Sequence, residues 1–437
     1  MNRMTSSTPG LRAMLKMRFV THYRRMAHGI SRNVRILLPT EPLWAIPVAW
    51  IRTYASLFME QLGLNAVQIG WLASLTLITQ MLVAPFGGYV ADRFGRKRTL
   101  IVFDIFSWVL PTILWMLARN VWFFVAAAIL NGINIIIWPS WSCLLVEDTR
   151  PDRRPIVFAG FQLVVLGAGL FSPIAGWIVD RYGVILGCRI IYAVAFTTIT
   201  IMTFVRGLLT RETSVGAAMV NELRGARLRD SLAGYREIYA EGFKNPTLIL
   251  LFFLVVINFG YQAIWTTYSI LYMTHPKGLA LSPGLAAAWP TFSSLVMIAT
   301  LVLLVPRIHV EKLPHWLIFS SGMLCVGTLL FILTPANSYI LLALSATLIG
   351  IGTVLVNPVR DAFIANVLED RHRATLLAGM NSLSMIAIVP LTPLAGRIFE
   401  VNPRAPLALL FLILSAGVFI SLALRRVSVT AHKAEAE

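Results

Sequence analysis

Twelve long apolar runs, separated by polar segments that are mostly short, make up most of the chain. Each run exceeds the roughly 17–20 residues that an α-helix needs to cross the hydrocarbon core of a bilayer. No water satisfies backbone groups there, so a run of this kind must be helical. The pattern therefore predicts an all-α integral membrane protein. The predicted transmembrane helices are 36–60, 67–87, 99–118, 120–145, 157–178, 184–208, 246–273, 285–306, 315–334, 338–366, 374–398 and 404–425.

The runs fall into two sets of six, divided by a polar segment at 209–245 that is rich in Arg, Glu and Gly. Two stretches recur in the same order in both sets: residues 54–59 match 268–273, and residues 139–160 match 358–379. Parallel repeats of this kind are typical of transporter folds. We therefore expect two pseudo-symmetric six-helix bundles. The predicted divisions are a basic amino-terminal segment (1–35), the two bundles (36–208 and 246–426), a cytoplasmic linker (209–245) and a cytoplasmic tail (427–437).

The distribution of charge indicates how the chain is oriented. Only 13% of the residues are charged, against about 25% in a typical soluble domain. When residues near the end of a run are counted with the nearer side, 29 of the 37 Lys and Arg residues lie on the side that carries both termini and 6 on the other side, and 2, Arg52 and Arg360, lie deep within runs. This asymmetry predicts cytoplasmic termini in a multi-pass protein of the cell membrane. The net charge of +17 thus reflects topology and attraction to anionic lipid, so we expect the bilayer, and no nucleic acid, as a partner.

Motifs of enzymes are missing from the sequence. It contains no P-loop, no HExxH motif and no credible Ser/His/Asp set. The three cysteines, Cys143, Cys188 and Cys325, lie in or beside apolar runs and form no metal-type pair. We therefore expect a protein that is not an enzyme and has no cofactor or metal. Without a nucleotide site, transport would be driven by the gradient of a proton, another ion or a solute.

Residues 88–98 (GYVADRFGRKR) lie between the second and third runs and are dense in charge, so we expect a short polar loop at the membrane surface. Gly88 would allow a neighbouring helix to approach closely, and Asp92 could accept hydrogen bonds from the start of another helix. Gly95 would permit a tight turn back into the membrane. Arg96, four residues after Asp92, is placed to pair with an acidic partner. An alternative interpretation is a basic loop that only fixes topology.

The pattern Gly-x-x-x-Asp-Arg-x-Gly-Arg-Lys resembles the loop 2–3 signature of the major facilitator superfamily of secondary transporters, and the resemblance covers about residues 36–426. It implies two bundles that expose a central site alternately to each side of the membrane. It also implies that the segment latches the two halves together on the inner side. The latch residues would be Gly88, Asp92, Arg93, Gly95, Arg96 and Lys97, with partners at Glu147, Asp148 and the start of the eleventh span near Thr375.

Two further segments bear on this resemblance. The corresponding segment of the second half, 306–314 (PRIHVEKLP), lacks the signature, so the latch would act mainly from the first half. The fifth run carries Gly160, Gly167, Gly169, Ser172-Pro173 and Gly176-Trp177. It is similar to the glycine- and proline-rich motif of antiporters in the superfamily, although Ser and Trp replace two of the glycines. The similarity favours export.

Arg52 lies near the middle of the first run, where a charge costs several kcal/mol unless it is paired or hydrated. Its counterpart in the second half is Thr266, so the charge is not a symmetric structural feature. We expect Arg52 to face a cavity and to hold an anionic group of a substrate or to pair with a titrating acid. The alternative is an arginine bound to helix carbonyls or to a structural acid.

Proton coupling requires a carboxyl group that titrates near working pH, and burial can produce one. The candidates are Asp361 in the tenth run, Glu60 at the outer end of the first and Asp104 near the inner end of the third. For Asp361 the alternative is an internal pair with Arg360 or a place in the latch. Structural roles are also open to Glu60 and Asp104.

Two runs carry polar and aromatic residues at helical spacing, and in a membrane such a face points into the bundle. It would suit an amphipathic or aromatic organic solute, although amides and Trp also join helices to one another. The candidate substrate-binding residues are Arg52, Asn131, Asn134, Trp138, Trp141, Asn258, Gln262 and Trp265.

Three functions follow from these features. The first is proton-coupled export of small organic compounds or drugs by a protein that we expect to be monomeric. The second is uptake or exchange of an organic anion bound through Arg52. The third is a membrane sensor or partner-binding protein that has lost transport. Substitution of Arg52 separates the first two, because only the second requires that cation.

Overall fold

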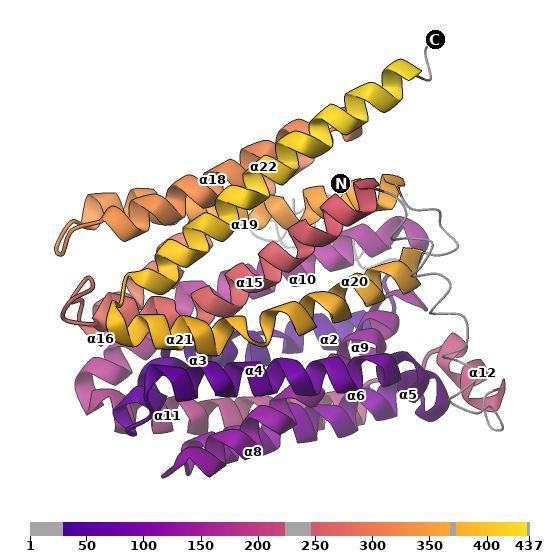
Figure 1. The fold of residues 1–437 in the computed structure, drawn as a ribbon. Helices are drawn as coiled ribbons and strands as arrows, with labels where there is room; N and C mark the ends of the chain where they lie inside the picture. Colours follow the sequence, from indigo (N-terminus) through magenta and orange to yellow (C-terminus); the bar gives the residue numbers. More distant parts are fainter. Residues whose placement is uncertain (1–28, 223–245, 368–372, 435–437) are drawn as a thin grey trace, which may run out of the picture.

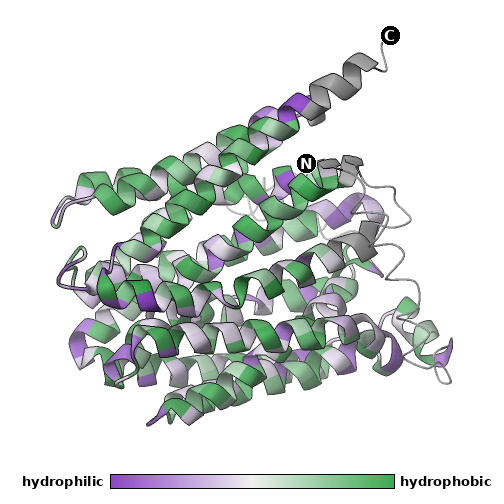
Figure 2. Ribbon diagram, in the orientation of Figure 1, coloured by the Kyte–Doolittle hydropathy of each residue, from purple (hydrophilic) through white to green (hydrophobic). Residues whose placement is uncertain are grey.

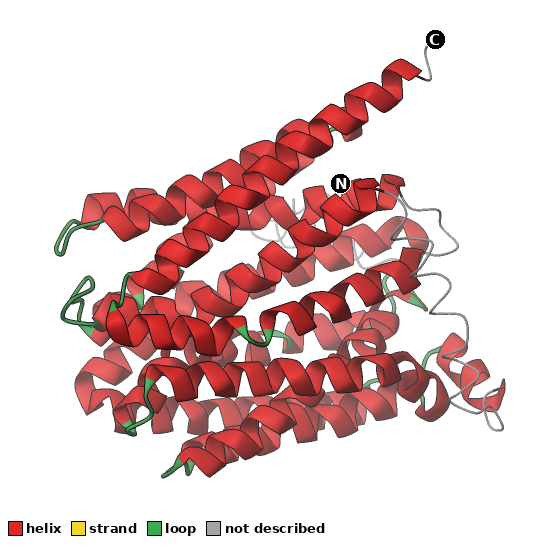
Figure 3. Cartoon of the chain, viewed as in Figure 1, coloured by secondary structure: helices red, strands yellow, loops and turns green. Residues whose placement is uncertain are grey.

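The computed structural model describes residues 29–222, 246–367 and 373–434 of the chain. Within these ranges the regular secondary structure is helical, and the long helices run alongside one another (Figures 1 and 3). The predictions for residues 1–28 and for the linker residues 223–245 fall outside the described ranges. The described part of the linker contains a short helix, α12 (Ser214–Glu222).

Eleven segments of the described chain are long and apolar enough to cross a membrane. The longest, Pro151–Leu209, has 59 residues, about twice the length that one span needs. Gly183 interrupts this segment, because its φ of 77° lies outside the range of a right-handed α-helix. The two arms count as separate spans and, with the ten other segments, give twelve. The prediction of an all-helical protein with twelve spans is confirmed.

Several spans consist of two helices in succession. In the first half of the chain the helices are α2 (Val34–Thr40), α3 (Pro42–Gln61), α4 (Ala66–Val83), α5 (Gly87–Phe94), α6 (Arg96–Asp104), α7 (Leu110–Met116), α8 (Val121–Gly132), α9 (Ile137–Val146), α10 (Arg154–Ala168) and α11 (Ser172–Leu209). In the second half they are α15 (Pro246–Thr274), α16 (Pro283–Ala286), α17 (Ala288–Leu303), α18 (Leu313–Leu333), α19 (Tyr339–Val367), α20 (Arg373–Ile388), α21 (Leu391–Val401) and α22 (Ala405–Ala434).

Local sequence explains where these helices begin and break. Asn65 and Gln68 form a capping box at the start of α4, with each side chain accepting from the backbone N–H of the other, at 2.8 and 3.0 Å. Asn120 caps α8 by accepting from Trp122 N at 3.1 Å. Pro85 lies in the 3-10 turn between α4 and α5, because proline has no N–H for a continuous helix.

Apolar residues dominate the middle of the helices, and polar residues gather at their ends and turns (Figure 2). Large apolar side chains on the outside of the bundle are exposed, for example Ile340 and Phe419. An outer surface of this kind would be unstable in water and suits the hydrocarbon core of a bilayer. Because the number of spans is even, both described ends of the chain lie on one side, together with α12 (Figure 1). We call this the terminal side.

The two halves are joined on the side opposite the termini by a symmetric pair of tyrosines. The Tyr54 hydroxyl on α3 donates to Pro283 O at the start of α16, at 2.8 Å. The Tyr268 hydroxyl on α15 lies 3.1 Å from Ala66 O at the start of α4 and 2.7 Å from Thr392 O. These tyrosines begin the two matching stretches of the sequence repeat, so each half bonds to the same place on the other.

Further contacts on this side bring backbones close together. Asp180 accepts from the backbone N–H of Gly284 at 2.8 Å, and Ser74 Oγ donates to Val389 O at 2.6 Å. A Cβ on Gly70 would lie 2.6 Å from Thr392 O, so only glycine fits between α4 and α21 there. The halves are therefore sealed together on the side opposite the termini.

Candidate functional site

Three hollows of about 290, 310 and 300 Å³ lie in the interior, and Arg52 is in the wall of all three. We call their combined space the central cavity. The first hollow is lined by both halves, with Trp44 on α3 and Trp265 on α15 among its residues. The third also has Thr266 in its wall. The cavity therefore lies between the two halves, where a pocket can be opened by a movement of one half relative to the other.

Arg52 lies on α3 two turns after Trp44, and both residues face the cavity. The side chain of Arg52 is exposed to this space. Among the described residues, none forms a hydrogen bond or an ion pair with it. A charge at this depth is costly unless water or a ligand solvates it. The structure thus places Arg52 in a cavity, and the cavity must supply its solvation.

An aromatic wall borders the part of the cavity nearest the terminal side. Trp138 and Trp141 on α9 stack with ring centroids 5.4 Å apart, and Phe161 on α10 lies 4.3 Å from Trp141. Trp44 and Trp108 meet edge to face at 5.2 Å. Sequence reasoning identified only the two tryptophans of α9. The other three rings come from separate helices, and no spacing in the sequence connects them.

The second half contributes a smaller aromatic group. Trp265 stacks on Tyr261 at 5.7 Å and also contacts Trp289 and Phe331, with centroids 5.6 and 5.0 Å away. Trp265 and Trp289 line the cavity opposite Arg52. Flat aromatic surfaces on both sides suit a planar, largely apolar ligand.

The predicted amide residues divide between two places. Asn131 and Asn134 line the cavity, but both already have partners. Asn131 donates to Ser107 O at 2.8 Å, and Asn134 accepts from Gln80 Nε2 at 3.3 Å. Gln262 is exposed and lies in the wall of none of the hollows found among the described residues.

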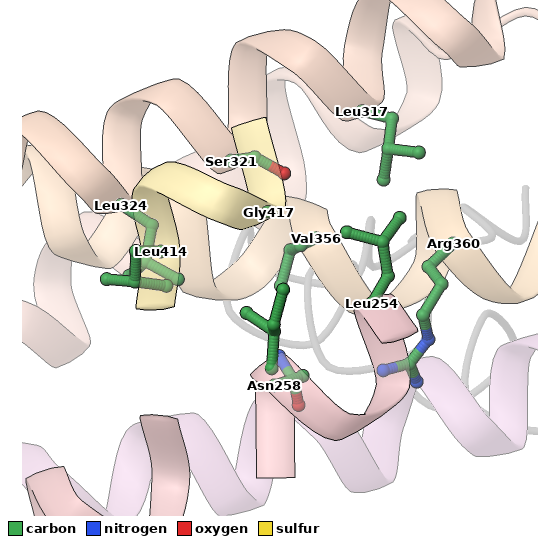
Figure 4. A pocket seen from close by; sticks show the side chains of 10 residues that line it. Leu254, Asn258, Leu317, Ser321, Leu324, Val356, Arg360, Leu414 and Gly417 are labelled. Atoms are coloured by element: carbon green, nitrogen blue, oxygen red, sulfur yellow. The ribbon is translucent and has the colours of Figure 1, made fainter. Parts of the chain in front are cut away.

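Asn258 lies in a separate, much smaller hollow within the second half (Figure 4). This hollow has a volume of about 20 Å³ and is otherwise lined mainly by apolar side chains, with Arg360 and Ser321 as the other polar residues. Its volume is enough for one water molecule and not for an organic solute. The structure therefore separates Asn258 from the central cavity and from Trp265, although both residues are on α15.

Three helices of the first half bring buried charges into the cavity wall. Arg206 on α11 donates to Glu41 at 2.5 Å, and their side chains are only 3% and 6% exposed. Arg206 also donates to Leu37 O at 3.2 Å and to Thr40 Oγ1 at 3.0 Å. Asp104 on α6 lies in the same wall and is 2% exposed. Sequence reasoning did not select Arg206, although its position in an apolar run was a signal.

The other two acidic candidates lie away from the cavity. Asp361 is 58% exposed and pairs with the neighbouring Arg360 at 2.7 Å, which is the alternative arrangement that the sequence left open. Glu60 is half-buried near the end of α3, on the side opposite the termini. Among the described hollows, neither residue lines the central cavity.

The signature segment 88–98 is not a loop, as the sequence suggested, but the end of α5 and the start of α6 joined at Gly95. Gly95 has a φ of 89°, and a Cβ there would lie 2.5 Å from Glu212 Oε2. Arg96 pairs with Asp92 and, at 3.2 Å, with Glu147. After the break at Pro85, α5 starts at Gly87 and ends at Gly95, the first residue in this segment with a positive φ.

The start of the linker completes this charged cluster. The Glu212 carboxylate accepts from the backbone N–H groups of Arg96 and Lys97, both at 3.0 Å, and so caps α6. Thr213 donates to Glu147, and Ser214 Oγ donates to Asp148 at 2.8 Å. Sequence reasoning missed Glu212, because its position 116 residues beyond Arg96 gives no local signal.

The remaining predicted latch residues lie at the edge of this cluster. Arg93 donates to the hydroxyl of Tyr89 and lies over its ring. In the described structure no atom comes within 4 Å of the position of a Cβ on Gly88, so the close approach expected there is not made in this conformation. The side chain of Thr375 lies outside the described residues.

Twelve spans around an interior cavity between two halves define a membrane transporter. The chain belongs to the Major Facilitator Superfamily, whose family model matches residues 43–317. The multidrug resistance protein 1 of Bacillus subtilis (strain 168) is 22% identical over 373 residues, which are 84% of this chain and 89% of the relative. The multidrug resistance protein MdtG of Yersinia enterocolitica is 26% identical over 303 residues, which are 67% of this chain and 69% of the relative.

Solved structures show the same fold. The nucleoside transporter NupG superposes with a TM-score of 0.68 at 13% identity, covering 91% of this chain and 99% of that one. The peptide transporter POT, in complex with sulfate, superposes with a TM-score of 0.66 at 17% identity, covering 93% and 97%. The prediction of the superfamily fold, made from the signature segment and the repeat, is confirmed.

Proposed function

We propose that the protein exports small organic compounds from the cytoplasm by alternating access, driven by the proton gradient. The central cavity carries this proposal, because it lies between the two halves, has aromatic walls and, in the described part of the chain, is closed by hydrogen bonds between the halves on the side opposite the termini. Relatives named as multidrug resistance proteins support an exporter of organic compounds. The glycine- and proline-rich fifth span supports the same direction.

The excess of Lys and Arg on the terminal side supports a cytoplasmic location for both termini. With that orientation the seal of Tyr54 and Tyr268 closes the outer face, and the structure is the state that loads substrate from the cytoplasm. The bundles 36–208 and 246–426 would then move as two units in a monomer. In the opposite state, Asp92 and Arg96 would join the halves on the inner side.

Asp104 is the best-placed candidate for proton coupling, because it alone among Asp104, Glu60 and Asp361 lines the cavity. A proton on Asp104 and a bound substrate would then occupy the same wall of the cavity, so binding of one could affect binding of the other. The other two acids would reach the cavity only through a rearrangement. Substitution Asp104→Asn should therefore remove the dependence of transport on the proton gradient, whereas Asp361→Asn should leave that dependence in place.

Uptake or exchange of an organic anion is the second candidate function. The observation that favours it is the side chain of Arg52 in the cavity wall, to which no described residue forms a hydrogen bond or an ion pair. This function requires Arg52, so Arg52→Gln should abolish flux of an anion. Export of uncharged or cationic compounds would continue in the same variant.

Flux in sealed vesicles tests the proposal. The purified protein is reconstituted into liposomes, and movement of the dye ethidium is followed with and without an imposed proton gradient. Gradient-dependent movement that a proton ionophore abolishes is expected. If the dye, an aromatic anion and an aromatic zwitterion all fail to move under any gradient, the transport function is refuted and the sensor function gains support.

A further inference from the structure

Four charged side chains line the hollow of about 310 Å³: Arg52, Arg206, Glu41 and Asp104. Their formal charges sum to zero. Two of them satisfy each other, because Arg206 and Glu41 form a buried ion pair at 2.5 Å. The backbone and hydroxyl acceptors around Arg206 complete its coordination. The cavity is thus left with one cation and one anion that this pair does not neutralise.

Among the described residues, neither Arg52 nor Asp104 forms a hydrogen bond or a close ion pair, although Asp104 is attracted by Arg206 and repelled by Glu41. Asp104 is 2% exposed, and its Oδ2 atom is buried without a hydrogen-bond donor. No hydrogen bond or ion pair to Arg52 occurs among the described residues. A buried polar atom without a partner costs free energy that a complementary ligand recovers on binding. The cavity therefore offers a binding position for an anionic group and another for a cationic N–H donor.

Unsatisfied indole groups occur in the same wall. The Nε1 atoms of Trp44 and Trp141 are buried and lack acceptors in the described structure. Trp44 lines two of the three hollows that Arg52 lines, so its N–H can assist in holding an anionic group. The rings of Trp138 and Trp141 provide a flat apolar surface near Asp104.

We propose that the cavity selects aromatic zwitterions, with the carboxylate of the solute bound to Arg52 and its protonated amine bound to Asp104. This substrate class rests on the proposed transport function. A simple anion would leave Asp104 without a donor, and a simple cation would leave Arg52 without an acceptor. A zwitterion satisfies both residues and preserves the neutrality of the cavity.

Binding of three matched probes tests this selectivity. The probes are 6-(aminomethyl)-2-naphthoic acid, its methyl ester and its N-acetyl derivative, which share one ring system and carry both charges, the positive charge alone and the negative charge alone. Affinity for the purified protein is measured near neutral pH by quenching of tryptophan fluorescence. The zwitterion should bind about tenfold more tightly than either analogue, since a hydrogen bond to a charged group contributes about 1.5–3 kcal/mol.

Two substitutions assign the charges. Arg52→Gln should remove the preference for the zwitterion over the methyl ester, and Asp104→Asn should remove the preference over the N-acetyl derivative. Each variant should retain the other preference, which a general structural defect would not produce. Arg181→Gln and Asp152→Asn are matched controls, because both residues are exposed.

Two results would overturn the inference. One is equal binding of all three probes by the unmodified protein, a comparison that needs no variant to fold. The other is an equal loss of affinity for all three probes in both variants, which would mean that Arg52 and Asp104 pair with each other when the cavity closes and do not bind the solute. Because the assay measures binding alone, selectivity without flux would refute transport only, and flux without selectivity would refute this substrate class only.

Discussion

Removal of one partner of the buried pair between Glu41 and Arg206 should destabilise the protein strongly, whereas replacement of both should not. The pair is almost completely buried and bonded at 2.5 Å. Deleting one partner of such a pair leaves an uncompensated charge, which costs about 3–5 kcal/mol. Replacing both charges with apolar side chains of similar volume is often close to neutral.

The structure also predicts which single substitution is worse. After Glu41→Leu, the Arg206 guanidinium keeps the acceptors Leu37 O and Thr40 Oγ1, so the loss should lie at the lower end of that range. After Arg206→Met, Glu41 remains buried with no donor among the described residues, so the loss should lie at the upper end. The double variant should be more stable than either single variant.

Unfolding of the purified protein in detergent micelles measures these differences, either by titration with denaturant or as the apparent melting temperature. Asp152→Ala is the matched control, because Asp152 pairs with Arg150 at 3.1 Å on the surface, with both side chains more than half exposed. Such a pair contributes about 0–1 kcal/mol. If the effects of Glu41→Leu and Arg206→Met simply add in the double variant, the two residues are not coupled and the reasoning fails.

Three further predictions concern the signature segment and the seal. Asp92→Asn should lower flux while the protein remains folded and inserted; unchanged flux would argue against a latch. Gly95→Ala should cost about 1–3 kcal/mol in unfolding experiments because of its positive φ, whereas Gly88→Ala, with open space around it, should cost much less. Tyr54→Phe and Tyr268→Phe should each weaken the seal by about 1 kcal/mol, seen as faster labelling, from the side opposite the termini, of a cysteine introduced into the cavity wall; unchanged labelling would contradict this role.

The first residues of the linker hold the signature segment in place, which the composition of the linker did not suggest. Glu212 caps α6, and Thr213 and Ser214 bond to the two acidic residues at the end of α9. In this conformation the signature segment is therefore held by the first half and by the linker. A latch that joins the halves would act next to these contacts. We therefore expect the start of the linker to change position when the halves move relative to each other.

Sequence reasoning located the cavity through Arg52, Trp138, Trp141 and Trp265, because polar or charged residues inside apolar runs have few stable positions except in the interior of the bundle. The same reasoning could not separate Asn258 from this group. One helix can face two different hollows along its length, and helical spacing alone does not show which helix packs against each turn.

The sequence by itself determined the number of spans, their helical character, the division into two related halves and the superfamily. These features follow from local causes: a bilayer imposes a length and a hydrogen-bonding requirement on each run separately. Only the tertiary structure decided that Arg206 neutralises Glu41, that Arg52 and Asp104 form no close ion pair within the described ranges and that two matching tyrosines seal one side. Those outcomes depend on residues more than a hundred positions apart, whose contacts are set by how the helices pack.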